Sequence, residues 1–356
     1  MDDLLSVGIV VVKAAVVMGA VLHLAALTTW VERKASALIQ NRIGANRAAI
    51  FGFDLAGIIN TLVADPVKAL TKEDFVPKGV SQFMHSLAPF MGMFPVIISF
   101  AVIPFGPPIV LDDRVITLQL AELNVGILYV LAMGSLAVYG TVLAGWVSKN
   151  KFSLMGSLRA SAQMISYEIT MGISIIGLLA LYQTLDFASI VEQQSGTVLG
   201  FLPKWGIFMS PFNWIAFILF FVSVMAETKR APFDLPESES ELVAGYMTEY
   251  SGMKFLLFWL GEFAEIVVAS ALVVVLFFGG WQLPYIDVSK FTLGPLIGAM
   301  VFGAKVSAFC VLQVIIRWSV PRFRYDQLLN LCWKLMLPIA LGNLVATIAW
   351  MIWLDS

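Results

Sequence analysis

The chain is poor in the side chains that bind metals and redox cofactors. Its 356 residues include only two cysteines, Cys310 and Cys332, and two histidines, His23 and His85. The cysteines stand alone in apolar stretches, without a CxxC motif or a Cys/His cluster, so neither an iron–sulfur cluster nor a structural zinc ion has enough ligands. Gly-rich phosphate-binding loops and nucleophile elbows are also missing from the sequence. We therefore expect no covalently bound or metal cofactor, and each histidine is more typical of helix packing than of a metal ligand.

Charge is scarce as well. Charged residues make up 13% of the chain and hydrophobic residues 59%, and the mean hydropathy is +0.87. A net charge of −2 without a basic patch argues against nucleic-acid binding. The sequence consists instead of apolar runs long enough to cross a bilayer as helices. We predict eight of them, at residues 4–31, 83–104, 117–145, 159–182, 212–226, 254–278, 294–316 and 332–353.

The first apolar run follows Asp2 and Asp3 rather than a basic segment, which favours a spanning helix over a cleaved signal peptide. The sequence has no internal repeat and no soluble segment of domain size. It thus predicts an all-α integral membrane protein with about eight transmembrane helices and amphipathic helices in the cytoplasmic loops. The whole chain, residues 1–356, is predicted to form a single polytopic membrane domain.

Basic residues are distributed unequally between the two sides of the membrane. Most fall in the odd-numbered connections between spans, whereas the even-numbered connections hold only Arg114, Lys204 and Lys290. The positive-inside rule then places the odd-numbered connections in the cytoplasm and both termini outside. In the first connection, apolar residues at helical spacing predict an amphipathic helix; they are Leu55, Ile58, Ile59, Leu62 and Val63, among Asp54, Asn60 and Asp65.

A densely acidic connection follows the fifth apolar run. It contains six acids, with Lys229 and Arg230 as nearby counter-charges; the acids are Glu227, Asp234, Glu237, Glu239, Glu241 and Glu249. Asp234, Pro236 and Glu237 form a helix-start pattern, which explains part of this charge without any further role. Crowded carboxylates that are shielded from water raise one another's pKa, so the remaining acids also fit a proton-binding cluster. The residues alone leave both interpretations open.

Further carboxylates lie inside the predicted spans. Glu168 falls about 13 Å along the fourth helix, and Glu262 and Glu265 lie three residues apart on one face of the sixth. A charge at the bilayer centre costs about 2.5–3.5 kcal/mol on insertion scales, so such residues usually face a bundle interior and mark a proton or ion path. The structural alternative is that these acids cap a helix end or form an ion pair with Arg159 or Lys254. We favour a functional role for Glu168 and Glu262, and less so for Glu265.

Four segments of the chain resemble a known family. They are ERKASALIQNRIGANR at 32–47, GWVSKNKFSLMGSLRASAQMISYEI at 145–169, ETKRAPFDLPESESELVAGYMTEYSGMKF at 227–255 and PRFRYDQLL at 321–329. In this order they closely resemble the membrane-embedded H subunit of bacterial NADH:quinone oxidoreductase (respiratory complex I), whose mitochondrial counterpart is NADH dehydrogenase subunit 1. Ala45, Val147 and Lys149 depart from the usual motif residues. These departures concern the conformation of loops rather than the family.

The resemblance implies which residues carry the function. It places one set of polar residues around a chamber by which quinone reaches the enzyme from the bilayer: Glu32, Arg33, Asp65, Arg230, Asp234 and Arg317. It places a second set in a proton-coupling row that leads into the membrane arm: Glu168, Glu227, Glu237, Glu239, Glu241, Glu249 and Glu262. None of these residues is implied to be catalytic, because the head-group chemistry is expected in a partner subunit.

The implied function is that of a non-redox subunit of a proton-pumping translocase, with ubiquinone or menaquinone as substrate. Its implied partners are hydrophilic quinone-site and iron–sulfur subunits on the cytoplasmic side, other membrane-arm subunits, and lipid. Its implied location is the bacterial inner membrane, as a multi-pass protein with both termini periplasmic. The alternative is the membrane anchor of a related hydrogenase or ferredoxin-linked complex. An independent transporter is disfavoured because inverted repeats are not evident, and a purely structural scaffold because of the intramembrane acids.

Overall fold

The computed structural model describes residues 2–46, 57–111, 114–198, 200, 202–236, 239–286 and 293–355. Within these ranges the helices are α1 (Asp2–Ile39), α2 (Asp65–Thr71), α3 (Gln82–Ser99), α4 (Gly126–Val147), α5 (Lys151–Tyr182), α6 (Phe187–Gln193), α7 (Asn213–Glu227), α8 (Glu239–Leu242), α9 (Gly252–Phe277), α10 (Gly294–Ser319), α11 (Tyr325–Asn330) and α12 (Leu337–Asp355). Two antiparallel hairpins pair β1 (Ile109–Leu111) with β2 (Arg114–Ile116) and β3 (Thr197–Val198) with β4 (Leu202–Pro203). π-Helical turns cover Asn60–Ala64 and Leu331–Met336, and 3-10 turns cover Phe100–Val102, Gly206–Phe208 and Gly245–Met247.

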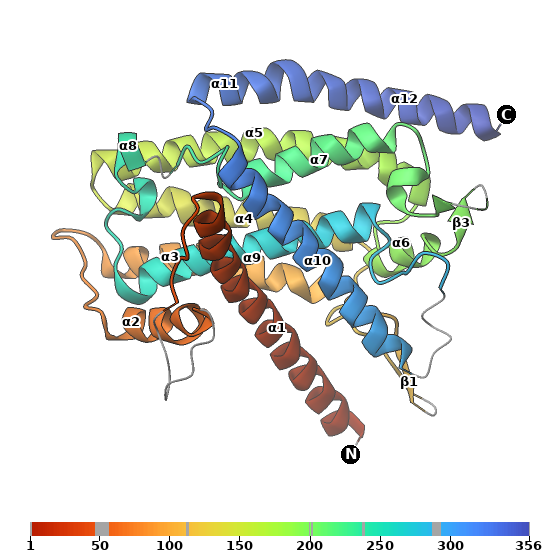
Figure 1. The fold of residues 1–356 in the computed structure, drawn as a ribbon, viewed down its shortest axis with the longest axis horizontal. Helices are drawn as coiled ribbons and strands as arrows, with labels where there is room; N and C mark the ends of the chain where they lie inside the picture. Colours follow the sequence, from red (N-terminus) through yellow and green to blue (C-terminus); the bar gives the residue numbers. More distant parts are fainter. Residues whose placement is uncertain are drawn as a thin grey trace.

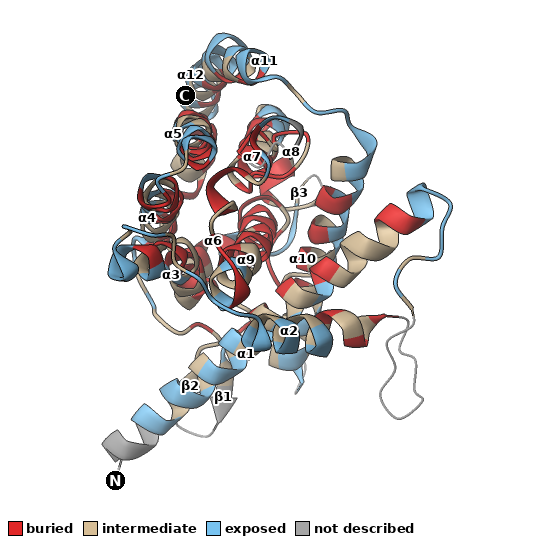
Figure 2. Cartoon of the chain, turned by 90° about the vertical axis from the view of Figure 1, so that its left-hand side faces the viewer, coloured by how far each residue is buried: buried red, intermediate tan, exposed pale blue. Residues whose placement is uncertain are grey.

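Helix α9 is the centre of the bundle. From Gly261 to Phe277, every residue except Glu265 is buried. Helices α1, α3, α7 and α10 pack against α9, and in a view along the bundle it lies inside a ring of helices whose buried residues face inward (Figure 2). A helix that is apolar on all sides is expected at such a position. The acids of α9 are therefore held away from the lipid.

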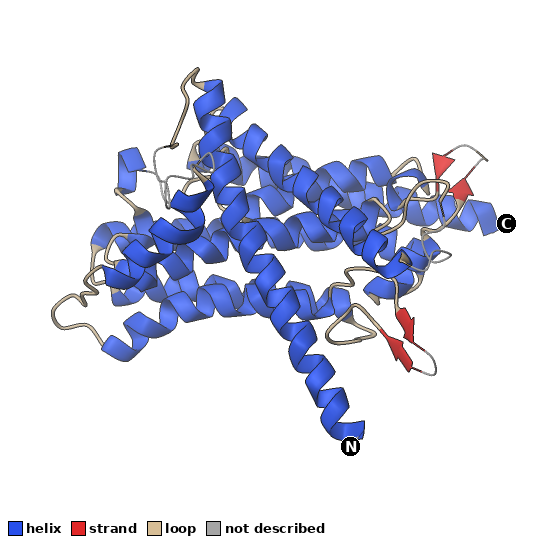
Figure 3. Cartoon of the chain, turned by 60° about the horizontal axis from the view of Figure 1, so that its bottom comes forward, coloured by secondary structure: helices blue, strands red, loops and turns tan. Residues whose placement is uncertain are grey.

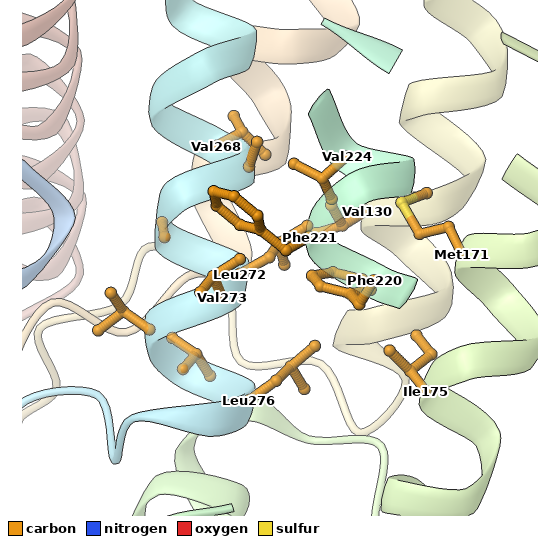
Figure 4. Close-up of a cluster of buried hydrophobic side chains, with 14 of the residues drawn as sticks. Val130, Met171, Ile175, Phe220, Phe221, Val224, Val268, Leu272, Val273 and Leu276 are labelled. Carbon is orange, nitrogen blue, oxygen red and sulfur yellow. The ribbon is translucent and has the colours of Figure 1, made fainter. Parts of the chain in front are cut away.

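Branched and aromatic side chains fill the space between α9 and its neighbours. Because lipid is as apolar as these side chains, close packing rather than the hydrophobic effect holds the helices together. The cluster in Figure 4 draws Val268, Leu272, Val273 and Leu276 from α9, Phe220, Phe221 and Val224 from α7, Met171 and Ile175 from α5, and Val130 from α4.

A lysine fixes the end of α9 that lies opposite the acidic connection. The ammonium of Lys305, on α10, donates hydrogen bonds to the backbone carbonyls of Phe278 (2.8 Å), Gly280 (3.0 Å) and Gln282 (2.7 Å). It also lies 4.7 Å from the centre of the Trp205 ring. Carbonyls at and beyond a helix C-terminus lack intrahelical partners, so this lysine satisfies them and ties α9 to α10.

Helices α1 and α10 cross the bundle obliquely, whereas α3, α5, α7 and α9 run along its long axis (Figure 1). Helix α1 has 38 residues, which corresponds to about 57 Å at 1.5 Å per residue. Its N-terminal half extends away from the other helices (Figure 3). A helix longer than the hydrocarbon thickness of about 30 Å is accommodated by tilting, and the oblique path of α1 fits this expectation.

The predicted all-α membrane architecture is confirmed, with differences in detail. Among the described residues, seven helical segments are long and apolar enough to cross a membrane. The predicted span at 212–226 is α7, whose 15 residues reach only about 22 Å. Helix α5 begins at Lys151 rather than near residue 159, because the side chain of Asn150 accepts a hydrogen bond from the N–H of Phe152 and caps the helix. The two short hairpins were not predicted.

The predicted amphipathic helix lies partly outside the described residues, because Asp54 and Leu55 fall within the undescribed segment 47–56. Its described part comprises the π-helical turn Asn60–Ala64 and α2. The turn packs against α1, and α2 packs against α9. This segment therefore lies against the bundle, beside the end of α1 that carries Arg33.

Candidate functional site

The connection between α7 and α9 begins with two buried cations. Lys229 and Arg230 are 6% and 7% exposed. The connection is held against α5 because the side-chain amide of Gln163 donates to the backbone carbonyls of Ala226 (2.7 Å) and Phe233 (2.8 Å). A charge removed from water needs a partner of opposite sign. Both cations accordingly point toward acids on neighbouring helices.

Arg230 lies between acids from two helices. Its guanidinium is 3.1 Å from the carboxylate of Glu262 on α9 and 3.7 Å from that of Glu32 on α1. It also lies over the ring of Phe263, 4.2 Å from the ring centre. Glu32 forms a second ion pair with Arg317 of α10. The connection, α1, α9 and α10 therefore meet in one network of charges.

The other cation of the connection, Lys229, contacts an acid that lies one helical turn further along α9. The ammonium of Lys229 lies 3.9 Å from the carboxylate of Glu265 and 5.7 Å from the ring centre of Tyr246. The hydroxyl of Tyr246 in turn donates a 2.6 Å hydrogen bond to Glu262. Consecutive cations in the connection thus face acids that are one turn apart on α9.

Glu227, the last residue of α7, shares a small cavity of about 40 Å³ with Glu265. Gly134 of α4 lies opposite, where a Cβ atom would come within 3.0 Å of the Glu227 carboxylate. No hydrogen bond or ion pair joins Glu227 to another residue that the structure describes. A polar cavity needs about 10–15 Å³ to hold a water molecule. The cavity that the two acids line therefore has room for a water molecule.

Glu168 of α5 forms the far end of this arrangement. Its carboxylate accepts a hydrogen bond from the hydroxyl of Ser135 on α4, and it lies near enough to Glu227 for the two acids to repel each other. The acids and cations form a file that runs from α2 to the α4–α5 pair. Its members are Asp65, Arg33, Glu32, Arg317, Arg230, Glu262, Lys229, Glu265, Glu227 and Glu168.

Asp234 lies beside this file, in the connection and outside the spanning helices. Burial raises the pKa of its carboxyl to about 6, against the opposing effect of Arg322 and Arg317; Glu262 adds to the rise and Arg230 opposes it. The guanidinium of Arg322 also donates to the backbone carbonyl of Asp234. The folded protein therefore favours the protonated form of this carboxyl more than the unfolded chain does.

Asp234 should make stability depend on pH. Because its pKa rises from 3.8 to about 6 on folding, its favourable contribution is complete below about pH 4 and is lost as the pH rises to about 6. We expect Asp234→Asn to stabilise the protein at pH 7 by about 2–3 kcal/mol, and to have only a small effect near pH 4. Thermal inactivation of the purified complex across this pH range measures the difference. Identical midpoints for the two proteins at pH 7 would show that the ionised carboxyl of Asp234 does not destabilise the folded protein.

Of the remaining predicted acids, the two whose side chains the structure describes, Glu241 and Glu249, are not members of the file. The side chain of Glu241 is 58% exposed and forms a 2.6 Å ion pair with Arg159. Glu249 accepts a 2.8 Å hydrogen bond from the side-chain amide of Asn150. Glu237 lies outside the described residues, and so does the side chain of Glu239, the first residue of α8. Glu241 therefore lies at the surface, whereas Glu249 is half-buried.

At the other end of the file, the ion pair between Arg33 and Asp65 (2.6 Å) joins α1 to α2. Two cavities of about 200 Å³ each lie beside this pair and share Asp65, Leu256 and Trp259 as lining residues. The Arg33 guanidinium lies 6.0 Å from the centre of the Trp259 ring. Apolar walls with a few polar groups at one end are typical of sites for small organic ligands.

Most members of the file can be identified from the sequence, but several of their contacts cannot. Glu265 received less weight than Glu262, yet it lies between Glu262 and Glu227. Tyr246 and Ser135 were not singled out, because a hydroxyl gives no signal in a charge pattern. His85 fits the predicted packing role, since it is buried and its ring stacks on Tyr250 with the ring centres 4.2 Å apart.

Comparisons with known proteins agree with one another. The family model described as NADH dehydrogenase matches residues 12–348. The chain is 44% identical over 343 residues to the first of the NADH-quinone oxidoreductase H subunits of Geobacter metallireducens, and the alignment covers 96% of each chain. It is 45% identical over 336 residues to the second H subunit of Geobacter sulfurreducens, with 94% of each chain covered. It is 41% identical over 353 residues to the H subunit of Syntrophotalea carbinolica, with 99% of each chain covered.

Proposed function

We propose, from the premise that this chain belongs to the NADH dehydrogenase family as an H subunit of NADH-quinone oxidoreductase, that it forms the chamber by which quinone leaves the bilayer and couples quinone reduction to proton movement. One observation carries the proposal. The file of acids and cations begins beside the cavities between α1, α2 and α9, and it ends between α4 and α5.

The cavities between α1, α2 and α9 suit a quinone. A quinone has an apolar tail and a head group with two carbonyl oxygens. Leu22, Ala26 and Leu256 provide apolar walls, and Arg33 provides hydrogen-bond donors at the polar end. The head group would thus meet the Arg33–Asp65 pair, while the reduction itself takes place in a hydrophilic partner subunit.

The file supports coupling because its cations have more than one acid within reach. Quinone reduction by two electrons requires two protons, so the charge beside Arg33 changes during turnover. Arg230 lies 3.7 Å from Glu32 and 3.1 Å from Glu262, and a shift toward either acid weakens its hold on the other. In a site of low dielectric constant, such shifts strongly change the electrostatic energy of the neighbouring charges. Glu265, Glu227 and Glu168 would then take up and release protons in response.

The same proposal assigns an orientation and partners. The Arg33 end of α1 and the connection with Lys229 and Arg230 would face the cytoplasm of a bacterial inner membrane, in accordance with the positive-inside rule. Hydrophilic quinone-site and iron–sulfur subunits would dock on that side. Other membrane-arm subunits would receive the end of the file at Glu168. The names of the relatives favour this assembly over a hydrogenase or ferredoxin-linked complex.

Narrowing the chamber tests the proposal. Ala26 lines the cavity beside Asp65, so Ala26→Phe should raise the apparent KM for quinone by about fivefold or more, since overpacking a site costs about 1–3 kcal/mol. Oxidation of NADH by an artificial acceptor that bypasses quinone should not change. Ala15→Phe, at an exposed position of the same helix, serves as the matched control. An equal KM for the two variants would exclude this cavity as the quinone path.

A further inference from the structure

A fourth cavity, larger than the two beside Asp65, lies further along α1 toward its N-terminus. Its volume is about 780 Å³, and it is bounded by α1, α9, α10 and the β1–β2 hairpin. Val12, Val267, Phe302 and Val306 are among its apolar lining residues. None of its lining residues also lines the cavities beside Asp65. It is therefore a separate site that the proposed quinone path does not use.

Lys13 is the single charged residue among those described as lining this cavity. Its ammonium forms no hydrogen bond or ion pair with any other residue in the described part of the chain. Lys13 precedes Arg33 by about 30 Å of helix, which matches the thickness of the hydrocarbon core. An oblique α1 (Figure 1) that crosses the membrane with Arg33 at one surface would place Lys13 in the opposite half of the hydrocarbon core. A cation at such a depth requires a counter-charge or contact with the polar head groups.

On the side of α10, this cavity has unoccupied space beside Gly303. A Cβ atom added to Gly303, which lines the cavity, would have no atom within 4 Å. The volume falls within the range of about 300–1,000 Å³ that is usual for sites of small organic molecules. The cavity therefore accepts a long apolar group without rearrangement of α10.

We propose that this cavity binds an anionic phospholipid, with an acyl chain along the apolar walls and the phosphate on Lys13. A phospholipid supplies both features that the site demands, an apolar chain and a negative charge at the level of a snorkelling amine. An apolar helix of a neighbouring subunit would fill the cavity but leave the Lys13 ammonium without a counter-charge. The site would bind lipid whether or not the quinone path is correctly assigned.

Photo-cross-linking of lipid tests the headgroup contact. The purified complex is placed in phosphatidylcholine nanodiscs that contain a small fraction of phosphatidylglycerol with a photoreactive acyl chain, and labelled peptides are identified by mass spectrometry. We expect labelling of α1 and α10. Lys13→Gln should reduce it about fivefold, because one basic residue near an anionic lipid contributes about 1 kcal/mol. Lys13→Arg should retain it, since the charge is kept.

A space-filling pair of variants tests the acyl-chain site. Gly303→Phe should abolish most of the labelling, whereas Gly342→Phe, on α12 and also without atoms within 4 Å of its added Cβ, should leave it unchanged. Labelling that persists in both Lys13→Gln and Gly303→Phe would overturn the proposal, as would equal losses in the two glycine variants. So would a disulfide cross-link between Gly303→Cys and a neighbouring subunit, which would identify the occupant as protein. None of these readouts depends on quinone turnover.

Discussion

Arg230→Met is expected to abolish most assembly of the complex. The substitution leaves Glu262 and Glu32 without the cation that lies between them. Both acids have side chains that are largely buried, and removal of one partner from a buried ion pair costs about 3–5 kcal/mol. The measurement is the amount of assembled complex in the membrane and its midpoint of thermal inactivation. Wild-type values of both would contradict the buried network.

Two further variants separate the cause from a general loss of an arginine. Arg324→Met removes an arginine from an ion pair with Asp326, in which the side chains are 74% and 60% exposed, so its effect should stay below about 1 kcal/mol. Adding Glu262→Gln to Arg230→Met removes the carboxylate that has lost its ion pair, since Glu32 keeps its pair with Arg317, and should restore part of the assembly. If the double variant assembles no better than the single one, the loss does not arise from an unpaired carboxylate.

Glu227→Gln should have the opposite profile, with normal assembly and a large loss of function. Glutamine has the size of glutamate, and Glu227 has no hydrogen bond or ion pair to another described residue that the substitution would break. Glutamine does not carry a transferable proton. A positioned proton-transfer group contributes about 100-fold or more to a rate, so NADH:quinone activity and proton pumping should fall together by roughly tenfold or more.

The control for this experiment is Glu192→Gln, at an exposed position of α6. It should leave activity, pumping and assembly unchanged. Glu227→Asp keeps the acid and should recover part of both functions. NADH oxidation by an artificial acceptor should be equal in all three variants, because none of the substitutions lies in the partner subunits that would oxidise NADH. Unaltered pumping in Glu227→Gln would remove Glu227 from the coupling path, whereas loss of assembly would make it a structural residue.

The fold was predictable from hydropathy to the extent that each helix is a continuous apolar run. The limits of that signal are visible at α7 and α5. The window 212–226 is apolar along its whole length, but apolarity does not say that α7 is too short to cross the core by itself. Residues 151–158 mix apolar side chains with Lys151, Ser153 and Ser157 and fall outside the predicted span, yet they extend α5 because Asn150 caps it there. The hairpins were missed because each strand has only two or three residues.

The site was predictable as a set of residues rather than as an arrangement. Glu168 and Glu262 could be found because a carboxylate inside an apolar run is costly without a role. Their partners could not, since the pairing of Arg230 with both Glu32 and Glu262 joins segments that are distant in the sequence. Glu241 illustrates the converse: it belongs to the acidic connection, but its side chain is largely exposed. Position in a charged motif therefore did not determine burial.

The two ion pairs between the connection and α9 limit how these two segments can move relative to each other. Lys229 and Arg230 are adjacent in the chain, while their partners Glu265 and Glu262 are three residues apart along the helix, about 4.5 Å in rise. A shift or rotation of α9 relative to the connection would misalign both ion pairs, Lys229–Glu265 and Arg230–Glu262, at the same time. Intermediate positions would separate both ion pairs at once, so they would be crossed rather than occupied. The geometry thus favours a small number of discrete positions of α9 relative to the connection over a continuous range of positions.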